Sequence, residues 1–322
     1  MMDGMHDVWL PAGPQAATLF QLWIAMLVVC VLVFVGVMAA LAIALRRAPR
    51  ATAATPPDLA VLTRGEPRLH RLIGGAVALS GVLLIGLLVA SFLTDRAIAQ
   101  LPLVDAVRID LIAHQWWWEA RYEPGDPARV FATANELHVP VGRPVLLTLR
   151  ADDVIHSFWV PNLHGKKDLI PGRESTFAFR ADRKGVYRGQ CTEFCGYQHA
   201  HMGLFVIADE PGDYARWEAA QRLPARAPRS DEERRGFELT TGSTCGMCHT
   251  IVGTSAQGQR APDLTHLAAR STLAAGTVPN TAVTLKAWVA NPQAIKPGVN
   301  MPAHAFADGD LAAISAYLGS LQ

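Results

Sequence analysis

The sequence predicts a multidomain fold: an N-terminal two-helix transmembrane hairpin, then an all-β domain, then an all-α domain. Residues 18–45 and 72–93 contain no charged side chain, and each run exceeds the roughly 18 apolar residues that indicate a membrane span. The pattern then changes to alternation, as at Val107, Ile109 and Leu111, which is typical of half-buried strands. Apolar residues at helical spacing return near the C-terminus.

The charges around the two apolar segments predict their orientation. No Lys or Arg precedes the first segment, whereas a signal peptide would begin with positive charge. The arginines between the segments are Arg46, Arg47, Arg50, Arg64, Arg68 and Arg71. Because Lys and Arg accumulate in cytoplasmic loops, we assign residues 1–95 to a two-pass hairpin in a bacterial inner (cell) membrane. Both termini are then expected on the periplasmic side.

Composition excludes one class of partner. The chain has 322 residues, a formal net charge of +1, and half of its residues are apolar. This length suits two or three domains, and a nearly neutral chain lacks the basic surface that nucleic acid requires. We therefore expect membrane lipid and other proteins as partners.

Potential metal ligands are concentrated in one short segment. The run from Cys191 to Met202 contains two thiols, two imidazoles, a carboxylate and a thioether, and His156 lies upstream. Thiolate and thioether donors suit copper, whereas calcium and magnesium prefer oxygen. The predicted ligands are His156, Cys191, Cys195, His199 and Met202. Five donors exceed the four of a structural zinc site, but they would suffice for two coppers that share both thiolates. A disulfide between the cysteines is the alternative in an oxidising compartment.

The pattern Cys-x-Glu-x-Cys-x3-His-x2-Met, with an upstream His-Ser-Phe, resembles the CuA site of subunit II of the haem-copper cytochrome c oxidases. The resemblance implies a cupredoxin-like fold for residues 105–210 and a binuclear copper centre. It further implies that Cys191 and Cys195 bridge the two coppers. His156 and Met202 would complete the coordination of one of them.

The same resemblance assigns the remaining positions around the copper centre. His199 and the main-chain carbonyl of Glu193 would serve the second copper, and the Glu193 side chain would reach a magnesium ion at the border with subunit I. Trp116, the first of three consecutive tryptophans, corresponds to a family residue near the copper where electrons enter. Arg173 follows Pro-Gly as in the family segment that faces subunit I, which makes it an interface candidate.

Residues 211–232 are rich in Ala, Arg and Pro with little periodicity, which indicates a linker. The spacing of Ser230 and Glu233 is that of a helix-capping box. We therefore expect a new helix to begin there and a separate domain to occupy residues 233–322.

The motif Cys245-Gly-Met-Cys248-His249 is the attachment signature of c-type haem. Its cysteines would bind the haem covalently, with His249 as the proximal iron ligand. A zinc half-site or a redox-active cysteine pair is the alternative. A downstream Met would complete the iron coordination, and Met301 lies in a segment that resembles the methionine loop of small cytochromes c. Pro262 matches the position whose carbonyl orients the proximal histidine in that family.

The whole chain resembles subunit II of a cytochrome c oxidase with a fused cytochrome c. This implies that electrons enter at haem c, pass to the coppers and leave through the Trp116 side to haem a of subunit I, where oxygen reduction is coupled to proton pumping. The implied partners are subunit I with its haem–copper site, subunit III, and a cytochrome c or the bc1 complex as electron donor. The alternatives are a CuA-bearing subunit of a nitric oxide reductase, or a structural quinol oxidase subunit II, which would lack the copper ligands.

Overall fold

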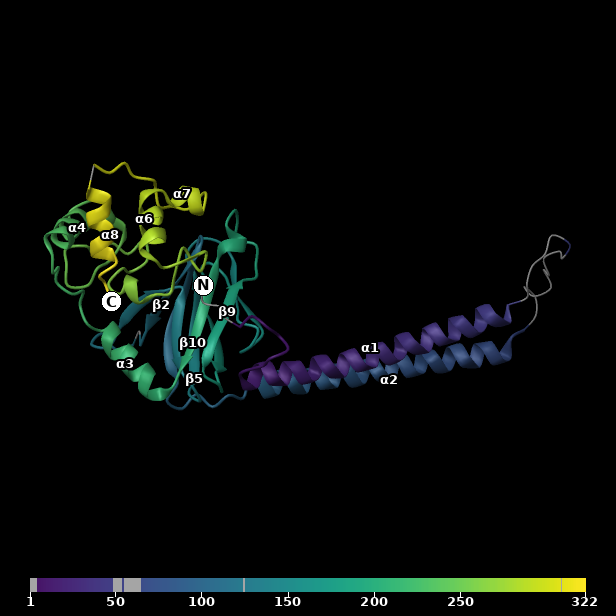
Figure 1. The fold of residues 1–322 in the computed structure, drawn as a ribbon. Helices are drawn as coiled ribbons and strands as arrows, with labels where there is room; N and C mark the ends of the chain where they lie inside the picture. The colour runs from purple at the N-terminus through teal and green to yellow at the C-terminus, as the bar shows by residue number, and fades with distance from the viewer. Residues whose placement is uncertain (1–4, 49–53, 55–64, 124, 308) are drawn as a thin grey trace. The chain divides into compact units, whose positions relative to one another are not determined.

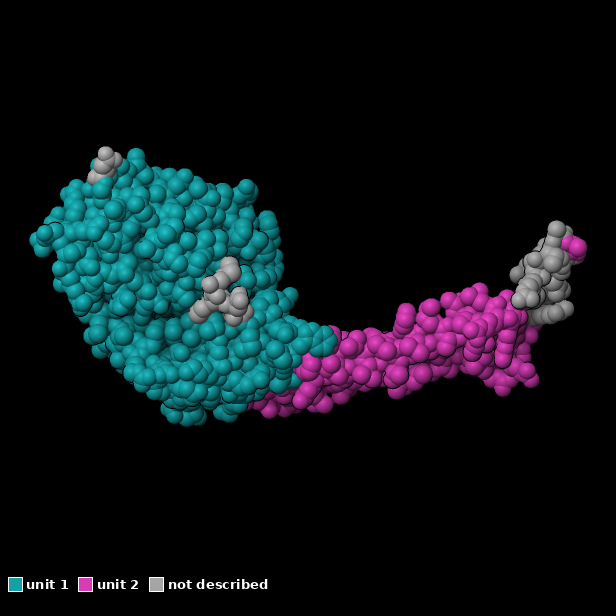
Figure 2. Space-filling view, viewed as in Figure 1, with its two compact units in different colours: residues 1–17, 101–322 teal, residues 18–100 magenta. Residues whose placement is uncertain are grey.

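The computed structural model describes residues 5–48, 54, 65–123, 125–307 and 309–322. Two compact units can be distinguished (Figure 2): Thr18–Gln100 forms one, and Met1–Ala17 together with Leu101–Gln322 forms the other. Each unit is described below by itself. Arg50 and Arg64, two of the arginines used to predict the orientation, lie outside the described residues.

The first unit consists largely of two long helices, α1 (Pro14–Arg47) and α2 (Pro67–Ile98). They have 34 and 32 residues, so each is longer than the roughly 20 residues needed to cross a bilayer. Their most apolar 18-residue windows have mean hydropathies of 3.1 and 2.5, and none of either window is buried within the protein. The predicted pair of apolar helices is therefore confirmed.

Two five-stranded sheets make up the domain that follows, here called the β domain (Figure 1). The first sheet has the order β3-β2-β1-β5-β8, and the second has the order β4-β10-β9-β6-β7. The strands are β1 (Val107–His114), β2 (Trp117–Tyr122), β3 (Phe131–Ala134), β4 (Glu136–Pro140), β5 (Pro144–Ala151), β6 (His156–Trp159), β7 (Lys166–Leu169), β8 (Ser175–Arg180), β9 (Gly185–Cys191) and β10 (Gly203–Asp209). This arrangement confirms the predicted all-β class.

Alternation along these strands builds the core of the β domain. Val145, Leu147 and Leu149 on β5 have no exposed surface, and the residues between them are partly exposed. Trp118 and Tyr122 are also fully buried and add large apolar volume. The resulting core is a rigid base for the loops that carry the predicted copper ligands.

Residues 5–17 pack on the β domain, although the sequence assigned them to the hairpin. The Met5 amide donates to the Val186 carbonyl at 2.8 Å, and the Met5 carbonyl accepts from the Arg188 amide at 2.8 Å. Ala12, which is 2% exposed, belongs to the same buried core. The compact helical unit accordingly begins at Thr18.

The predicted linker contains a helix, α3 (Pro211–Gln221). Tyr214 is buried, and the Trp217 ring stacks on His138 at 4.3 Å. Packing of these two aromatic side chains against the β domain explains a helix where the sequence has little periodicity. The connection between the domains is therefore shorter than residues 211–232.

The remaining helices form a separate C-terminal domain with its own core (Figure 1). They are α4 (Asp231–Thr241), α5 (Cys245–Cys248), α6 (Ala282–Ala290), α7 (Pro292–Ile295) and α8 (Asp310–Leu318). The side chain of Ser230 accepts from the Glu233 amide at 3.1 Å, so α4 begins at the predicted cap. A short hairpin, β11 (Thr272–Leu273) and β12 (Val278–Pro279), interrupts the helices.

Candidate metal centre and haem site

The predicted copper ligands come from two strand ends and the loop between β9 and β10. His156 opens β6, and Phe158 on the same strand pairs with Cys191 at the end of β9. The chain then turns through Cys195 and a single 3-10 turn, His199–His201, before β10 begins. Pairing of β6 with β9 thus brings His156 to the cysteine loop.

All five predicted donors lie together. Cys191 Sγ lies 3.9 Å from His156 Nδ1 and 3.7 Å from Cys195 Sγ. Cys195 Sγ in turn lies 3.5 Å from His199 Nδ1 and 3.8 Å from the Met202 sulfur. A disulfide needs sulfurs about 2.05 Å apart, so the two cysteines are free thiols here.

Burial and charge prepare this cluster for a metal. Four of the donors are at most 2% exposed: His156, Cys191, Cys195 and Met202. A hydrogen bond with the Cys195 thiol lowers the pKa of Cys191, and the same pairing raises the pKa of Cys195. A bound metal would deprotonate both thiols. Two sulfurs, a thioether and two imidazoles fit soft copper better than magnesium or calcium.

Asp153 is a residue that the sequence analysis missed. Its Oδ1 lies 2.8 Å from Nε2 of His156, and its Oδ2 accepts from the Gln115 amide at 2.6 Å. Burial lowers the pKa of His156, but the interactions with Asp153 and Cys191 together outweigh this effect and leave that pKa raised. The carboxylate holds the ring with Nδ1 toward the sulfurs, which is the usual way that a metal-binding histidine is oriented. A carboxylate three positions before a predicted histidine ligand was the available signal.

The main-chain carbonyl and the side chain of Glu193 lie in different surroundings. Its main-chain carbonyl accepts from Cys191 Sγ at 3.2 Å, so it faces the sulfur cluster. Its side chain is exposed. His201 is a bystander, because its Nδ1 is 2.8 Å from the Gln198 side-chain oxygen.

Trp116 lies against the copper loop and is only 9% exposed. Its Nε1 donates to the Cys195 carbonyl at 2.9 Å. On the other side is the segment before Met301: a Cβ added at Gly298 would lie 3.9 Å from the Trp116 ring. Trp116 therefore contacts both the copper loop and the segment before the predicted haem ligand.

The haem-binding motif occupies α5 and the residue after it. His249 Nδ1 donates to the Pro262 carbonyl at 2.7 Å, which leaves Nε2 free to bind iron. Burial lowers the pKa of His249, which favours the neutral ring that a metal needs. Cys248 is exposed and Cys245 half-buried, so both thiols are accessible to a haem.

The predicted second iron ligand lies in a loop with fixed backbone. The Gln293 side chain donates to the carbonyls of Val299 at 2.7 Å and Met301 at 2.8 Å. Met301 itself is half-buried. Met247, between the two cysteines, is 72% exposed.

Comparisons with known proteins match the two domains to two families. Residues 123–209 match the family described as cytochrome C oxidase subunit II, periplasmic domain, and residues 233–322 match the family described as cytochrome c. The chain joins a cytochrome c oxidase subunit II domain to a cytochrome c domain. From here on, the β domain is called the subunit II domain and the C-terminal domain the cytochrome c domain.

Relatives with the subunit II name come from several bacteria. Cytochrome c oxidase subunit 2 of Alkalihalophilus pseudofirmus is 35% identical over 219 residues, which are 68% of this chain and 62% of the relative. That of Bacillus subtilis is 31% identical and covers 61% of this chain and 56% of the relative. The chain thus spans about three fifths of the length of the curated relatives it matches. A solved structure, the periplasmic domain of subunit II of cytochrome oxidase of Bradyrhizobium japonicum, is 28% identical, covers 38% of this chain and 97% of its own, and has a TM-score of 0.35.

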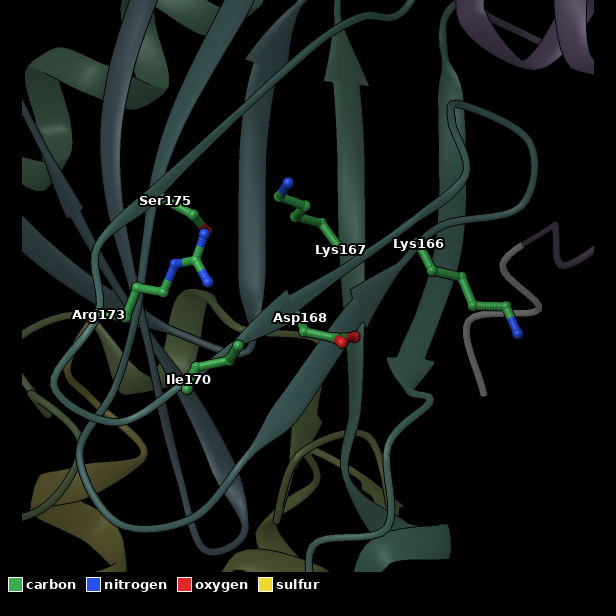
Figure 3. Close-up of a pocket in the computed structure, with 6 residues that line it drawn as sticks. All are labelled: Lys166, Lys167, Asp168, Ile170, Arg173 and Ser175. Carbon is green, nitrogen blue, oxygen red and sulfur yellow. The ribbon is translucent and has the colours of Figure 1, made fainter. Parts of the chain in front are cut away.

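A hollow of about 240 Å³ lies on the subunit II domain around β7 and β8 (Figure 3). Its lining residues are Lys166, Lys167, Asp168, Ile170, Arg173 and Ser175. None of the predicted metal ligands lines it. Arg173, the interface candidate, thus lines a hollow whose side chains carry a net positive charge.

Proposed function

We propose that this protein is the electron-transfer subunit II of a haem-copper terminal oxidase, which passes electrons from its own haem c to a binuclear CuA centre and on to haem a of subunit I. One observation carries the proposal. Five donors meet in one cluster, four of them buried, and Trp116 contacts both this loop and the segment before the predicted haem ligand Met301.

The predicted ligands fall into two sets, one for the coppers and one for the haem. Cys191 and Cys195 would bridge the coppers, with His156 and Met202 on one and with His199 and the Glu193 carbonyl on the other. In the cytochrome c domain, Cys245 and Cys248 would attach the haem, and His249 and Met301 would bind its iron. When bound, these groups supply one-electron carriers that need no proton or substrate pocket.

The protein's own residues keep the ligands still. Asp153 fixes the His156 ring, the Pro262 carbonyl fixes the His249 ring, and the strands below the copper loop form a dense core. Ligands held on a rigid scaffold move little when an electron arrives, which keeps the barrier to transfer low. Trp116 bridges the two sites, so we assign it to the path by which electrons reach the coppers.

The location follows from the helices and the family. α1 and α2 would span the inner membrane twice, with the arginine-rich connection in the cytoplasm and both metal domains outside. Subunit I would then lie beside the subunit II domain, with a magnesium ion held by the exposed Glu193 side chain at their border. Subunit III and a donor cytochrome c or bc1 complex complete the expected assembly, which would reduce oxygen and pump protons.

Paramagnetic resonance of the copper-loaded full chain in detergent tests the copper assignment. Two coppers that share both thiolates delocalise one unpaired electron, so we expect a seven-line mixed-valence signal. A four-line mononuclear signal would refute the binuclear centre. Identification of the subunit purified with this chain separates an oxidase from a nitric oxide reductase.

A further inference from the structure

A lysine is buried at the contact between the two metal domains. Lys296 of the cytochrome c domain is 1% exposed. Its Nζ donates to the Trp116 carbonyl at 2.7 Å, to the His201 carbonyl at 2.8 Å and to the Ala274 carbonyl at 3.1 Å. An ammonium group has three N–H donors, and all three are used here. Two of the three acceptors belong to the subunit II domain.

Burial of a lysine is costly unless its charge is compensated. Desolvation lowers the pKa of Lys296 to about 7, which shows how strongly the surroundings oppose its charge. Two of the three carbonyls that compensate this charge come from the subunit II domain, so the carbonyl cage serves the contact between the domains.

The residues after Lys296 continue this contact toward Met301. The Gln198 side chain donates to the Pro297 carbonyl at 2.6 Å. Gly298, with φ of +86°, brings its backbone against the Trp116 ring, and Val299 packs on the core of the subunit II domain. The loop that carries the predicted iron ligand thus packs against Trp116.

A second polar anchor lies on the same interface. Glu136 on β4 is 4% exposed and accepts from the Ser271 amide at 2.9 Å and the Thr272 amide at 3.1 Å. Between the two anchors, the Gly203 amide donates to the Ala275 carbonyl at 3.0 Å.

The turn of the β11–β12 hairpin is shaped for this contact. Ala274 and Ala275 have φ of 54° and 58°, a conformation that is unfavourable for alanine. Their carbonyls accept from Lys296 and from Gly203 of the subunit II domain. The turn therefore places two carbonyl acceptors at the contact between the domains, although this requires an unfavourable backbone conformation at both alanines.

We propose that Lys296 is a positioning residue that locks the cytochrome c domain onto Trp116, so that the fused cytochrome is a fixed rather than a diffusing electron donor to the copper centre. This inference rests on the proposed function. It also means that the protein's own cytochrome c domain covers Trp116, and that an external donor reaches the haem and not the copper loop.

The test compares two substitutions in the full chain, loaded with copper and haem in detergent. Lys296→Met retains the unbranched stem of the side chain and removes the ammonium group with its three donors. Lys286→Met makes the same change at an exposed position of α6 in the same domain. The first readout is hydrogen exchange at the amides of Gly203 and Ser271, which bond across the interface. The second is the rate of electron transfer from photoreduced haem to copper.

We expect Lys296→Met to lose amide protection at both positions and to slow the transfer by at least about tenfold, since small misplacements of reacting groups carry large penalties in rate. Lys286→Met should match the wild type in both readouts. Unchanged protection and rate in Lys296→Met would overturn the proposal. Lost protection with an unchanged rate would overturn it too, because the lysine would then be only a structural contact.

The wild-type chain offers a measurement that needs no variant. Transfer from a locked domain does not depend on solvent viscosity, whereas transfer from a tethered, diffusing domain slows in glycerol. A viscosity-dependent rate would therefore contradict the lock. Failure of the proposed function would be distinct: the wild type would show no binuclear copper signal, while the protection of the Gly203 amide can still be measured.

Discussion

At the scale of single residues, Asp153 shows how a neighbouring carboxylate prepares a metal ligand. It contacts His156 on the nitrogen that faces away from the sulfurs and also accepts from the Gln115 amide next to Trp116. One side chain therefore links a predicted copper ligand to the backbone before the tryptophan. Such a residue affects metal affinity without touching the metal.

Substitution of Asp153 by Ala should weaken copper binding by about 10- to 100-fold, because His156 loses the partner that orients its ring. A chelator competition titration of the full chain measures this affinity. Asp152→Ala is the matched control, since the Asp152 side chain is 75% exposed and its partner is His114 rather than a predicted ligand. Equal copper affinities for the two variants would show that Asp153 has no role in holding His156.

Met301 allows a similar test of the haem site. Met301→Ala should remove the sulfur ligand of the iron and with it the low-spin spectrum of methionine-ligated haem. Met247→Ala is the control, because Met247 is 72% exposed and lies between the haem cysteines. Absorption spectra of both reduced and oxidised variants give the result. A low-spin methionine spectrum that survives in Met301→Ala would mean that another residue binds the iron.

The ligand positions themselves could be predicted because they are local. Cys191, Cys195, His199 and Met202 fall within one short run, and their spacing indicates a metal before any fold is known. Asp153 and its contact with His156 were not predicted, because a carboxylate near a histidine is too common in sequences to be informative by itself. The types of donor atom determine which metal the site prefers, and the fold determines which neighbouring side chains orient those donors.

At the scale of elements, the crossing of α4 and α8 depends on one glycine. A Cβ added at Gly236 would lie only 2.0 Å from the Ala313 carbonyl oxygen and 2.8 Å from the Tyr317 Cβ. The two helices can approach this closely only because residue 236 has no side chain. Their contact closes the core of the cytochrome c domain around Tyr317, which has no exposed surface.

Gly236→Ala should lower the free energy of unfolding of the cytochrome c domain by about 1–3 kcal/mol, the usual penalty of forcing extra volume into a packed core. Denaturant unfolding followed by haem absorbance reports on this domain. Gly212→Ala is the control in α3, where the added Cβ would meet only the Arg216 side chain at 3.7 Å. A Gly236→Ala variant as stable as this control would contradict the close packing seen between α4 and α8.

The elements were predictable where the apolar pattern is periodic and less so elsewhere. The strands around Val107, Leu147 and Phe177 and the long apolar helices follow directly from their patterns. Helix α3 was not predicted, because its segment lacks an apolar period; Tyr214 and Trp217 anchor it, and Asp213 and Glu218 pair with Lys184 and Arg129. Its stability comes from tertiary contacts, which local propensity does not contain.

At the scale of the whole molecule, the sequence predicted the order of the parts but not their contacts. The hydrogen bond from Lys296 to Trp116 joins residues 180 positions apart, and the one from Ser271 to Glu136 joins residues 135 apart. Neither pair has a spacing that any local pattern could reveal. The separation into a subunit II domain and a cytochrome c domain could therefore be predicted from the sequence, whereas the contacts between the two domains could not.

The proposed orientation of the chain in the membrane can be checked with single cysteines. Val130 is exposed on the subunit II domain, and Ala48 follows α1 on the side of the arginine-rich connection. Because Lys and Arg mark cytoplasmic loops, a membrane-impermeant maleimide should label Val130→Cys in cells with a permeable outer membrane. It should label Ala48→Cys only after the inner membrane is opened. The wild-type chain corrects for reaction of the native cysteines. Labelling of Ala48→Cys before that step, with Val130→Cys protected, would place both metal domains in the cytoplasm, where the reducing environment does not support c-type haem attachment.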